Sequence, residues 1–192
     1  MLNSKMIVKG TLLSIAMAFS QGAIADSMKL DDAMSSVSFF SVKNGSVGEA
    51  HSIPQLTGTI SEKGELNIEL FLTSVQTNIP IRDTRLNRHV FDSENHPIAT
   101  ITANVEGKIP DSGVAMVETE GELTLRGVKK KINVSAMVAN TGDKVLVSSI
   151  KPIVINAADY GMVEGVKELQ DLVKLMSIAT SVPVNFSLTF SK

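Results

Sequence analysis

Three arginines and two of the three histidines of this chain lie in one stretch, between Ile79 and Pro97. A guanidinium group donates paired hydrogen bonds in a geometry that matches a phosphate or a carboxylate. In one interpretation Arg82, Arg85 and Arg88 present such donors to the head group of a ligand at a barrel mouth. The candidate head-group residues are Arg82, Asp83, Arg85 and His89. In the alternative interpretation, nearby carboxylates neutralise the arginines on a solvated helix face. The nearby carboxylates are Asp83, Asp92 and Glu94.

The same stretch has the pattern of a short helix. Pro80 fixes its own φ and favours an extended Ile79, so the preceding strand should end there. Leu86 and Val90 are four residues apart and would lie on one side of the helix. The neighbouring side holds Arg82, Arg85 and His89. We expect a helical turn that covers one end of a β structure, with the cations near its outer surface.

Eight segments have the pattern of β-strands, and the clearest is 65–73, in which Leu66, Ile68, Leu70 and Leu72 recur at every second residue. Turn signals separate the segments, including Asn44-Gly45 and Arg126-Gly127. Closing such a set of hairpins removes its edge strands, so we predict an all-β chain with two short helices, folded as an antiparallel up-and-down eight-stranded β-barrel. A two-sheet sandwich is the alternative. The eight segments are 34–42, 55–61, 65–73, 98–107, 114–125, 128–138, 144–154 and 183–190.

A second helix is predicted over 163–176, where apolar residues recur with the 3.6-residue period of an amphipathic helix. These residues are Val166, Leu169, Leu172, Val173 and Met176. The pattern indicates a helix that packs on the barrel or covers its mouth. A mobile lid or a partner-binding helix is the alternative.

Two motifs, in this order along the chain, resemble the YceI-like family. The first has the form Arg-Asp-x-x-Leu followed by Phe, an acidic residue and Pro, and the second is Leu-Thr-Leu-Arg-Gly-Val at 123–128. The residues that match the first are Arg82, Asp83, Leu86, Phe91, Asp92 and Pro97. The resemblance covers about Met34 to Phe190. It implies a periplasmic or secreted lipocalin-like barrel, and some members of this family hold isoprenoid lipids.

The composition permits a ligand cavity in such a barrel, because eight-stranded barrels either fill with side chains or hold one small ligand. After residue 25 the chain has six Phe, one Tyr and no Trp, so few bulky side chains can fill the interior. Flexible methionines suit a long apolar ligand or an ordinary core. Besides the head-group residues, the candidate ligand-binding residues are Phe39, Leu70, Leu86, Phe91 and Tyr160.

The first 25 residues have the pattern of a secretory signal peptide. Lys5 and Lys9 precede the apolar run 11–19, and the small-residue cleavage site Ala23-Ile24-Ala25 follows. We therefore predict a signal peptide at 1–25 and a YceI-like barrel domain at 26–192, released in the periplasm or secreted with Asp26 as its first residue. No later stretch reaches the ~20 apolar residues of a membrane-spanning helix. The chain has no cysteine, so it forms no disulfide.

Charge and motifs exclude several functions. Two of the 18 lysines and arginines precede residue 26, so the rest of the chain has 16 basic and 20 acidic residues. The resulting formal charge of −4 argues against a nucleic-acid partner. The signatures of serine hydrolases, phosphate-binding loops and zinc proteases are absent. His51, expected in a loop, has no metal-ligand spacing to His89 or His96. We expect no enzyme activity, no catalytic residue and no metal site.

Together these observations predict an exported soluble barrel that binds an apolar, isoprenoid or quinone-like lipid in its interior, with no other cofactor. One alternative is an envelope or stress-associated interaction protein with a filled barrel and no ligand. A cryptic enzyme is a further alternative. The expected partner is an apolar small molecule or lipid, and the sequence leaves open whether the chain forms a homodimer.

Overall fold

The computed structural model describes residues 27–192, which form eleven β-strands and two α-helices. The predicted signal peptide, 1–25, lies outside the described residues. The strands are β1 (Met28–Leu30), β2 (Ser36–Lys43), β3 (Val47–Ile53), β4 (Leu56–Ile60), β5 (Glu65–Phe71), β6 (Ile98–Asn104), β7 (Gly113–Leu125), β8 (Val128–Asn140), β9 (Lys144–Ser149), β10 (Ile153–Asn156) and β11 (Ser181–Ser191). The helices are α1 (Pro80–Arg85), which continues into a π-helical turn (Leu86–Phe91), and α2 (Val163–Leu172).

The eleven strands occupy eight positions in one closed antiparallel ring. One edge of β11 pairs with β1 and β2, and the other edge pairs with β9 and β10. In the same way, β3 pairs with β2 while β4, which follows β3 directly, pairs with β1. These three pairs of short strands are therefore single barrel strands, each interrupted once. The predicted eight-stranded antiparallel barrel is confirmed, and the sandwich is not formed.

Each interruption has a local cause. The segment Asp32–Met34 forms a 3-10 turn between β1 and β2, and its backbone N–H groups leave the ladder. Pro54 separates β3 from β4, and Pro152 separates β9 from β10. Proline has no N–H to donate to a neighbouring strand, so a barrel strand bends or breaks where it occurs.

The expected strands differ from the observed ones at four places. The strand before Pro80 ends at Phe71 and does not reach Ile79. The predicted strand 144–154 is divided by the residues 150–152, which follow β9 and precede β10. The short strand β1 was missed, and so was β3, because the inner face of β3 holds polar Glu49 and His51 where alternation predicts apolar residues. His51 accordingly lies in a strand and is 5% exposed, whereas a loop was expected.

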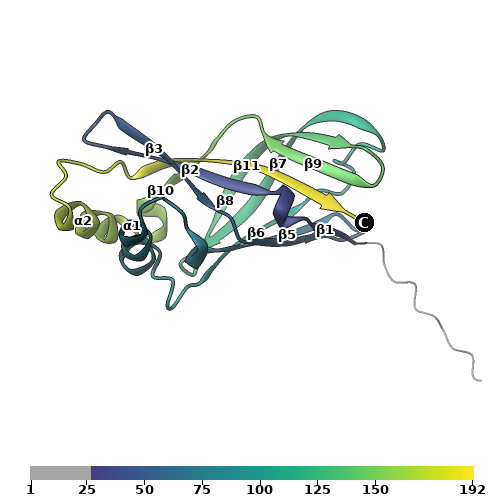
Figure 1. The fold of residues 1–192 in the computed structure, drawn as a ribbon. Coiled ribbons are helices and arrows are strands. Elements are labelled where there is room, and N and C mark those ends of the chain that lie inside the picture. The colour runs from purple at the N-terminus through teal and green to yellow at the C-terminus, as the bar shows by residue number, and fades with distance from the viewer. Residues whose placement is uncertain (1–26) are drawn as a thin grey trace, which may run out of the picture.

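Figure 1 shows that α1 and α2 lie together at one end of the barrel, whereas the C-terminus of the chain lies at the opposite end. We call the first the helical end. The helical turn expected between Ile79 and Pro97 is confirmed: Pro80 begins α1, and Asp92, with φ of 50°, ends the π-helical turn. At the β7–β8 hairpin, Arg126 and Gly127 both have positive φ, which suits the two-residue turns that match the twist of paired strands.

The second predicted helix is confirmed but ends four residues early, at Leu172. Val173 leaves helical geometry and Lys174 has φ of 53°, so the 3.6-residue rhythm does not continue to Met176. The buried face of α2 consists of Gly165 and Leu169, beside half-buried Val166. Three residues assigned to that face by their spacing are exposed instead. They are Leu172, Val173 and Met176.

Gly165 sets how closely α2 approaches the π-helical turn. A Cβ at this position would lie 1.8 Å from the backbone carbonyl oxygen of His89, far inside van der Waals contact. We therefore expect Gly165→Ala to lower the melting temperature, because overpacking typically costs 1–3 kcal/mol and exceeds the ~1 kcal/mol by which alanine favours a helix over glycine. Thermal unfolding followed by circular dichroism measures this change.

The matched control is Lys167→Ala, on the exposed side of the same helix. It should leave the melting temperature within a degree or two. A Gly165→Ala variant as stable as the unmodified protein would show that α2 does not need this close contact.

Candidate ligand-binding cavity

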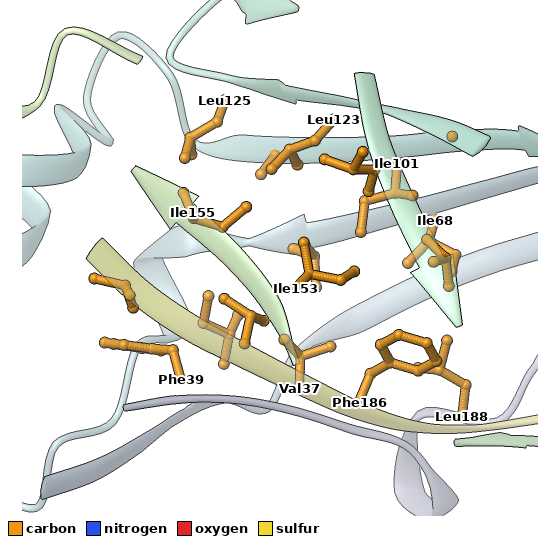
Figure 2. A pocket seen from close by; sticks show the side chains of 18 of the residues that line it. Val37, Phe39, Ile68, Ile101, Leu123, Leu125, Ile153, Ile155, Phe186 and Leu188 are labelled. Atoms are coloured by element: carbon orange, nitrogen blue, oxygen red, sulfur yellow. The ribbon is translucent and has the colours of Figure 1, made fainter. Parts of the chain in front are cut away.

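The barrel encloses a cavity of about 250 Å³ whose wall is almost wholly apolar. Figure 2 shows side chains that converge on one space from strands on different sides of the ring. The labelled ones are Val37, Phe39, Ile68, Ile101, Leu123, Leu125, Ile153, Ile155, Phe186 and Leu188. These residues alternate along their strands with outward-facing ones, which is how a strand presents one face to a barrel interior.

The cavity runs along the barrel axis. At the helical end its wall includes Phe91 of the π-helical turn and Val166 and Leu169 of α2. At the other end it includes Val105 and Lys108, which follow β6. Because β6 starts next to the helices and has seven residues, each advancing about 3.4 Å, these two groups of residues lie at opposite ends of the cavity.

Four of the nine predicted ligand-binding residues line this cavity. They are Phe39, Leu70, Leu86 and Phe91. The rings of Phe39 and Phe91 meet edge to face with centroids 6.5 Å apart, so a strand and the π-helical turn come together at the helical end. Tyr160 is buried in the adjacent apolar core, where burial raises the pKa of its phenol, and it does not line the cavity.

The charged candidates lie outside the cavity wall, and Arg82 is already bound by other groups of the protein. Its Nη1 donates to Glu49 Oε2 at 2.8 Å and its Nη2 donates to the carbonyl oxygen of Thr77 at 2.7 Å. The side chain is 20% exposed, so it is not the outer-surface cation that the helical pattern predicted. Its neutralising carboxylate is Glu49 on β3, which is distant in sequence, and not Asp83, Asp92 or Glu94.

Asp83 has a structural role at the start of the helical segment. Its Oδ1 accepts hydrogen bonds from both the backbone N–H and the hydroxyl of Thr77. His89 lies beside α2, with Nδ1 3.0 Å from Glu168 Oε1. Arg85 is half-buried and does not line the cavity. The structure therefore places the apolar candidates, except Tyr160, in the cavity wall and the polar candidates outside it. Among the polar ones Arg82 connects α1 to the barrel and His89 contacts α2.

Sequence reasoning missed a polar pair at the cavity wall. Ser41 of β2 lines the cavity, and its Oγ lies 2.8 Å from Nε2 of His51 on β3. The His51 ring packs against Phe39 with centroids 5.1 Å apart. Burial, and then the positive charge of Arg82, lower the pKa of His51 and so favour its neutral imidazole at pH 7. This pair could have been predicted only by recognising β3 as a strand and pairing it with β2.

A small charged cluster lies next to this pair. Glu49 accepts from Lys43 Nζ at 2.9 Å as well as from Arg82, and the hydrogen bond from Lys43 lowers the pKa of the Glu49 carboxyl. Within residues 27–192, no three His, Cys, Asp or Glu side chains gather closely enough to hold a metal ion. None of the helices in that part of the chain has the length and apolar composition needed to cross a bilayer.

The closed ring and its apolar interior define a β-barrel with one elongated cavity, covered at one end by helices. Comparison with known protein families gives a match to the YceI-like domain over residues 28–190. The chain therefore belongs to the YceI-like family, as the motifs at 82–97 and 123–128 indicated. No curated protein matches the chain.

Solved structures agree with this assignment. A polyisoprenoid binding domain from Saccharophagus degradans, implicated in plant cell wall breakdown, is 30% identical, with a TM-score of 0.82 over 87% of this chain and 98% of that one. BcnA from Burkholderia cenocepacia has the same fold at 18% identity, with a TM-score of 0.67 over 83% of this chain and 98% of that one. A YceI protein from Campylobacter jejuni shares the fold at 15% identity, with a TM-score of 0.54 over 74% of this chain and 84% of that one.

Burial of neutral His51 predicts a pH dependence of stability. Because the pKa of His51 is lower in the folded chain than in the unfolded one, the unfolded chain binds more protons as the pH falls below about 6.5. The free energy of unfolding should therefore decrease from about pH 7.5 to pH 5.5, by at most about 1.4 kcal/mol per pH unit from this residue. Urea unfolding at several pH values measures the slope.

His51→Gln cannot titrate in this range and should flatten the slope, whatever its effect on stability at pH 7.5. His96→Gln, which changes a histidine outside the cavity wall, is the control and should keep the slope. An unchanged slope in His51→Gln would contradict the assignment of a buried neutral imidazole.

Proposed function

We propose that this protein binds an isoprenoid-type lipid, with the hydrocarbon chain extended along the barrel interior. The observation that carries the proposal is the cavity itself, whose wall is apolar along most of its length. An apolar chain that moves from water into such a space gains roughly 25 cal/mol for each Å² of surface removed from water. A cavity wall with so few polar groups offers no comparable interaction to a sugar, a nucleotide or a peptide backbone.

The comparisons support this proposal at the level of lipid class. The similar domain from Saccharophagus degradans is described as polyisoprenoid binding, and its structure overlaps nearly the whole barrel. The cavity favours ligand binding over the alternative of a filled barrel that acts only through its outer surface. We propose binding without catalysis, because the Ser41–His51 pair at the cavity wall lacks the carboxylate that orients a catalytic histidine: His51 Nδ1 has no hydrogen-bond partner among the described residues.

The proposed site has its entrance or its head-group end beside the helices. Phe39, Leu86 and Phe91 lie there, and α2 covers them through Val166 and Leu169. At the opposite end, the Nζ of Lys108 donates a hydrogen bond to the carbonyl oxygen of Glu118 at 3.1 Å. At the helical end the wall carries the hydroxyl of Ser41, which places one hydrogen-bonding group there for the head of a lipid.

Leu70 provides a direct test, because it lines the cavity on β5. Leu70→Trp should place the larger ring in the path of the chain and weaken binding of farnesol by roughly tenfold or more, equivalent to about 1.4 kcal/mol. Isothermal titration of lipid-free protein measures the affinity. Thermal unfolding in parallel is required, because overpacking alone typically costs 1–3 kcal/mol of stability.

Phe71→Trp is the matched control, since Phe71 is the neighbouring residue of β5 and is absent from the cavity wall. It should bind farnesol like the unmodified protein. Solvent extraction and mass spectrometry of protein purified from its native source provide the complementary measurement, and isoprenoid material is expected. Failure of farnesol and longer prenols to bind, together with a lipid-free native extract, would refute the proposed function.

We further propose export to the periplasm or secretion, on the basis of the N-terminal pattern of Lys5, Lys9, the apolar run and the Ala23–Ala25 site. Expression of the full chain in a bacterium with working secretion should yield protein whose N-terminal residue is Asp26. N-terminal sequencing of the periplasmic fraction tests this expectation. Full-length protein retained in the cytoplasm of the same cells would contradict it.

A further inference from the structure

The inner face of the β2–β3 hairpin changes from apolar to polar towards the helical end. Val37 and Ile53 are paired across the two strands, then Phe39 and His51, then Ser41 and Glu49. In this series Ser41 is the residue on the cavity wall that carries a hydroxyl at the helical end, and His51 lies directly behind it. The hairpin therefore presents one hydrogen-bonding group to a space that is otherwise apolar there.

The hydrogen bonding of His51 indicates whether the Ser41 hydroxyl donates to the imidazole or accepts from it. His51 is 5% exposed, its Nε2 lies 2.8 Å from Ser41 Oγ, and its Nδ1 is buried with no partner among the described residues. A neutral imidazole has one N–H, and a buried N–H without an acceptor is rarer in proteins than an incompletely satisfied acceptor. The N–H is therefore on Nε2 and donates to Ser41 Oγ.

This arrangement leaves the hydroxyl hydrogen of Ser41 free to donate. Ser41 lies on the cavity wall, and its Oγ makes its side-chain hydrogen bond within residues 27–192 to His51 alone. An acceptor oxygen inside the cavity would complete the chain from His51 Nε2 through Ser41 Oγ to the ligand. Hydrogen bonds arranged in such a chain polarise and strengthen one another.

We propose that Ser41, positioned by His51, donates a hydrogen bond to an uncharged oxygen of the ligand's head group, either a carbonyl or a hydroxyl. This inference rests on the proposed function and specifies which end of the lipid occupies the helical end of the cavity. Ser41 is the contacting residue, and His51 is a positioning residue that keeps the Ser41 hydroxyl hydrogen directed away from itself.

The neighbouring charges favour an uncharged head group over an anionic one. Glu49 accepts hydrogen bonds from both Lys43 and Arg82, and Thr77 takes a further N–H of Arg82. Lys43 Nζ and both Nη atoms of Arg82 are thus held by protein groups, whereas Arg82 Nε is buried without a partner among the described residues. Neither cation lines the cavity beside Ser41. An anion placed at Ser41 would be desolvated without a free cation to compensate, and that is costly.

The test compares four ligands that share one hydrocarbon chain: farnesal, farnesol, farnesene and farnesyl monophosphate. Ser41→Ala should weaken farnesal and farnesol by about 3- to 10-fold, the range expected for loss of one net hydrogen bond, and should leave farnesene unchanged. Because a hydrocarbon leaves water more readily than an alcohol, the informative quantity is the change caused by the variant for each ligand. Farnesyl monophosphate should bind the unmodified protein more weakly than farnesol.

Two further variants separate a lost hydrogen bond from altered packing. Ser41→Thr keeps the hydroxyl and should retain most of the affinity for farnesal. Ser38→Ala removes a hydroxyl from the same strand at a residue outside the cavity wall, and should change no affinity. Thermal unfolding of each variant confirms that the barrel is intact.

The outcomes are distinct. An equal loss for farnesal and farnesene, or no loss for either, overturns the role of Ser41 while lipid binding stands. A loss for farnesol alone shows that Ser41 accepts instead of donating, and tighter binding of the monophosphate shows an anionic head-group site; each of these overturns the inference. If the unmodified protein binds none of the four ligands, the proposed function fails with it.

Discussion

The barrel depends on the closure of its ring at β11 and β1. The strand β11 pairs with β9 and β10 along one edge and with β1 and β2 along the other, so one strand connects the first and last parts of the chain. β1 has three residues, yet it pairs with both β4 and β11 and leaves no free edge at that point. Phe190, next to the end of β11, is 1% exposed, and this packing holds the closing contact in place.

The interrupted strands explain how a closed ring can hold a covered cavity. β2 and β3 form a hairpin whose outer part extends beyond the closed ring towards the helical end. Arg82 connects α1 to this hairpin through Glu49, and Thr77 binds both Arg82 and Asp83. Because the Arg82 and Glu49 side chains remain 20% and 29% exposed, their ion pair adds about 0–1 kcal/mol at most, and its main effect is to fix geometry.

The same geometry brings α2 over the cavity. Gly165 allows the helix to approach the His89 carbonyl, and Arg126 donates from Nη1 to the carbonyl oxygen of Gly161 at 2.7 Å, just before α2 begins. Val166 and Leu169 then face the interior and close the helical end with apolar side chains. Two residues of the family motifs, Asp83 and Arg126, therefore act here by positioning helices against the barrel, and Leu86 and Phe91 by forming its lining.

The sequence by itself determined the features that depend on local periodicity. Alternation placed Leu66, Ile68 and Leu70 on one face of a strand, and this face lines the cavity. The Arg126-Gly127 turn correctly placed the β7–β8 hairpin, because φ in a tight turn is a local property. Pro80 likewise marked the start of α1. These features required no knowledge of what lies across the barrel.

Only the tertiary structure decided the features that depend on contacts between distant segments. Glu49 is 33 residues from Arg82, so no sequence spacing could identify it as the partner that removes this arginine from the list of free cations. The Ser41–His51 pair likewise exists because β2 and β3 are adjacent, and polar residues on the inner face of β3 hid that strand from a reading based on alternation. A buried polar side chain is stable only beside its partner, and the partner is set by the fold.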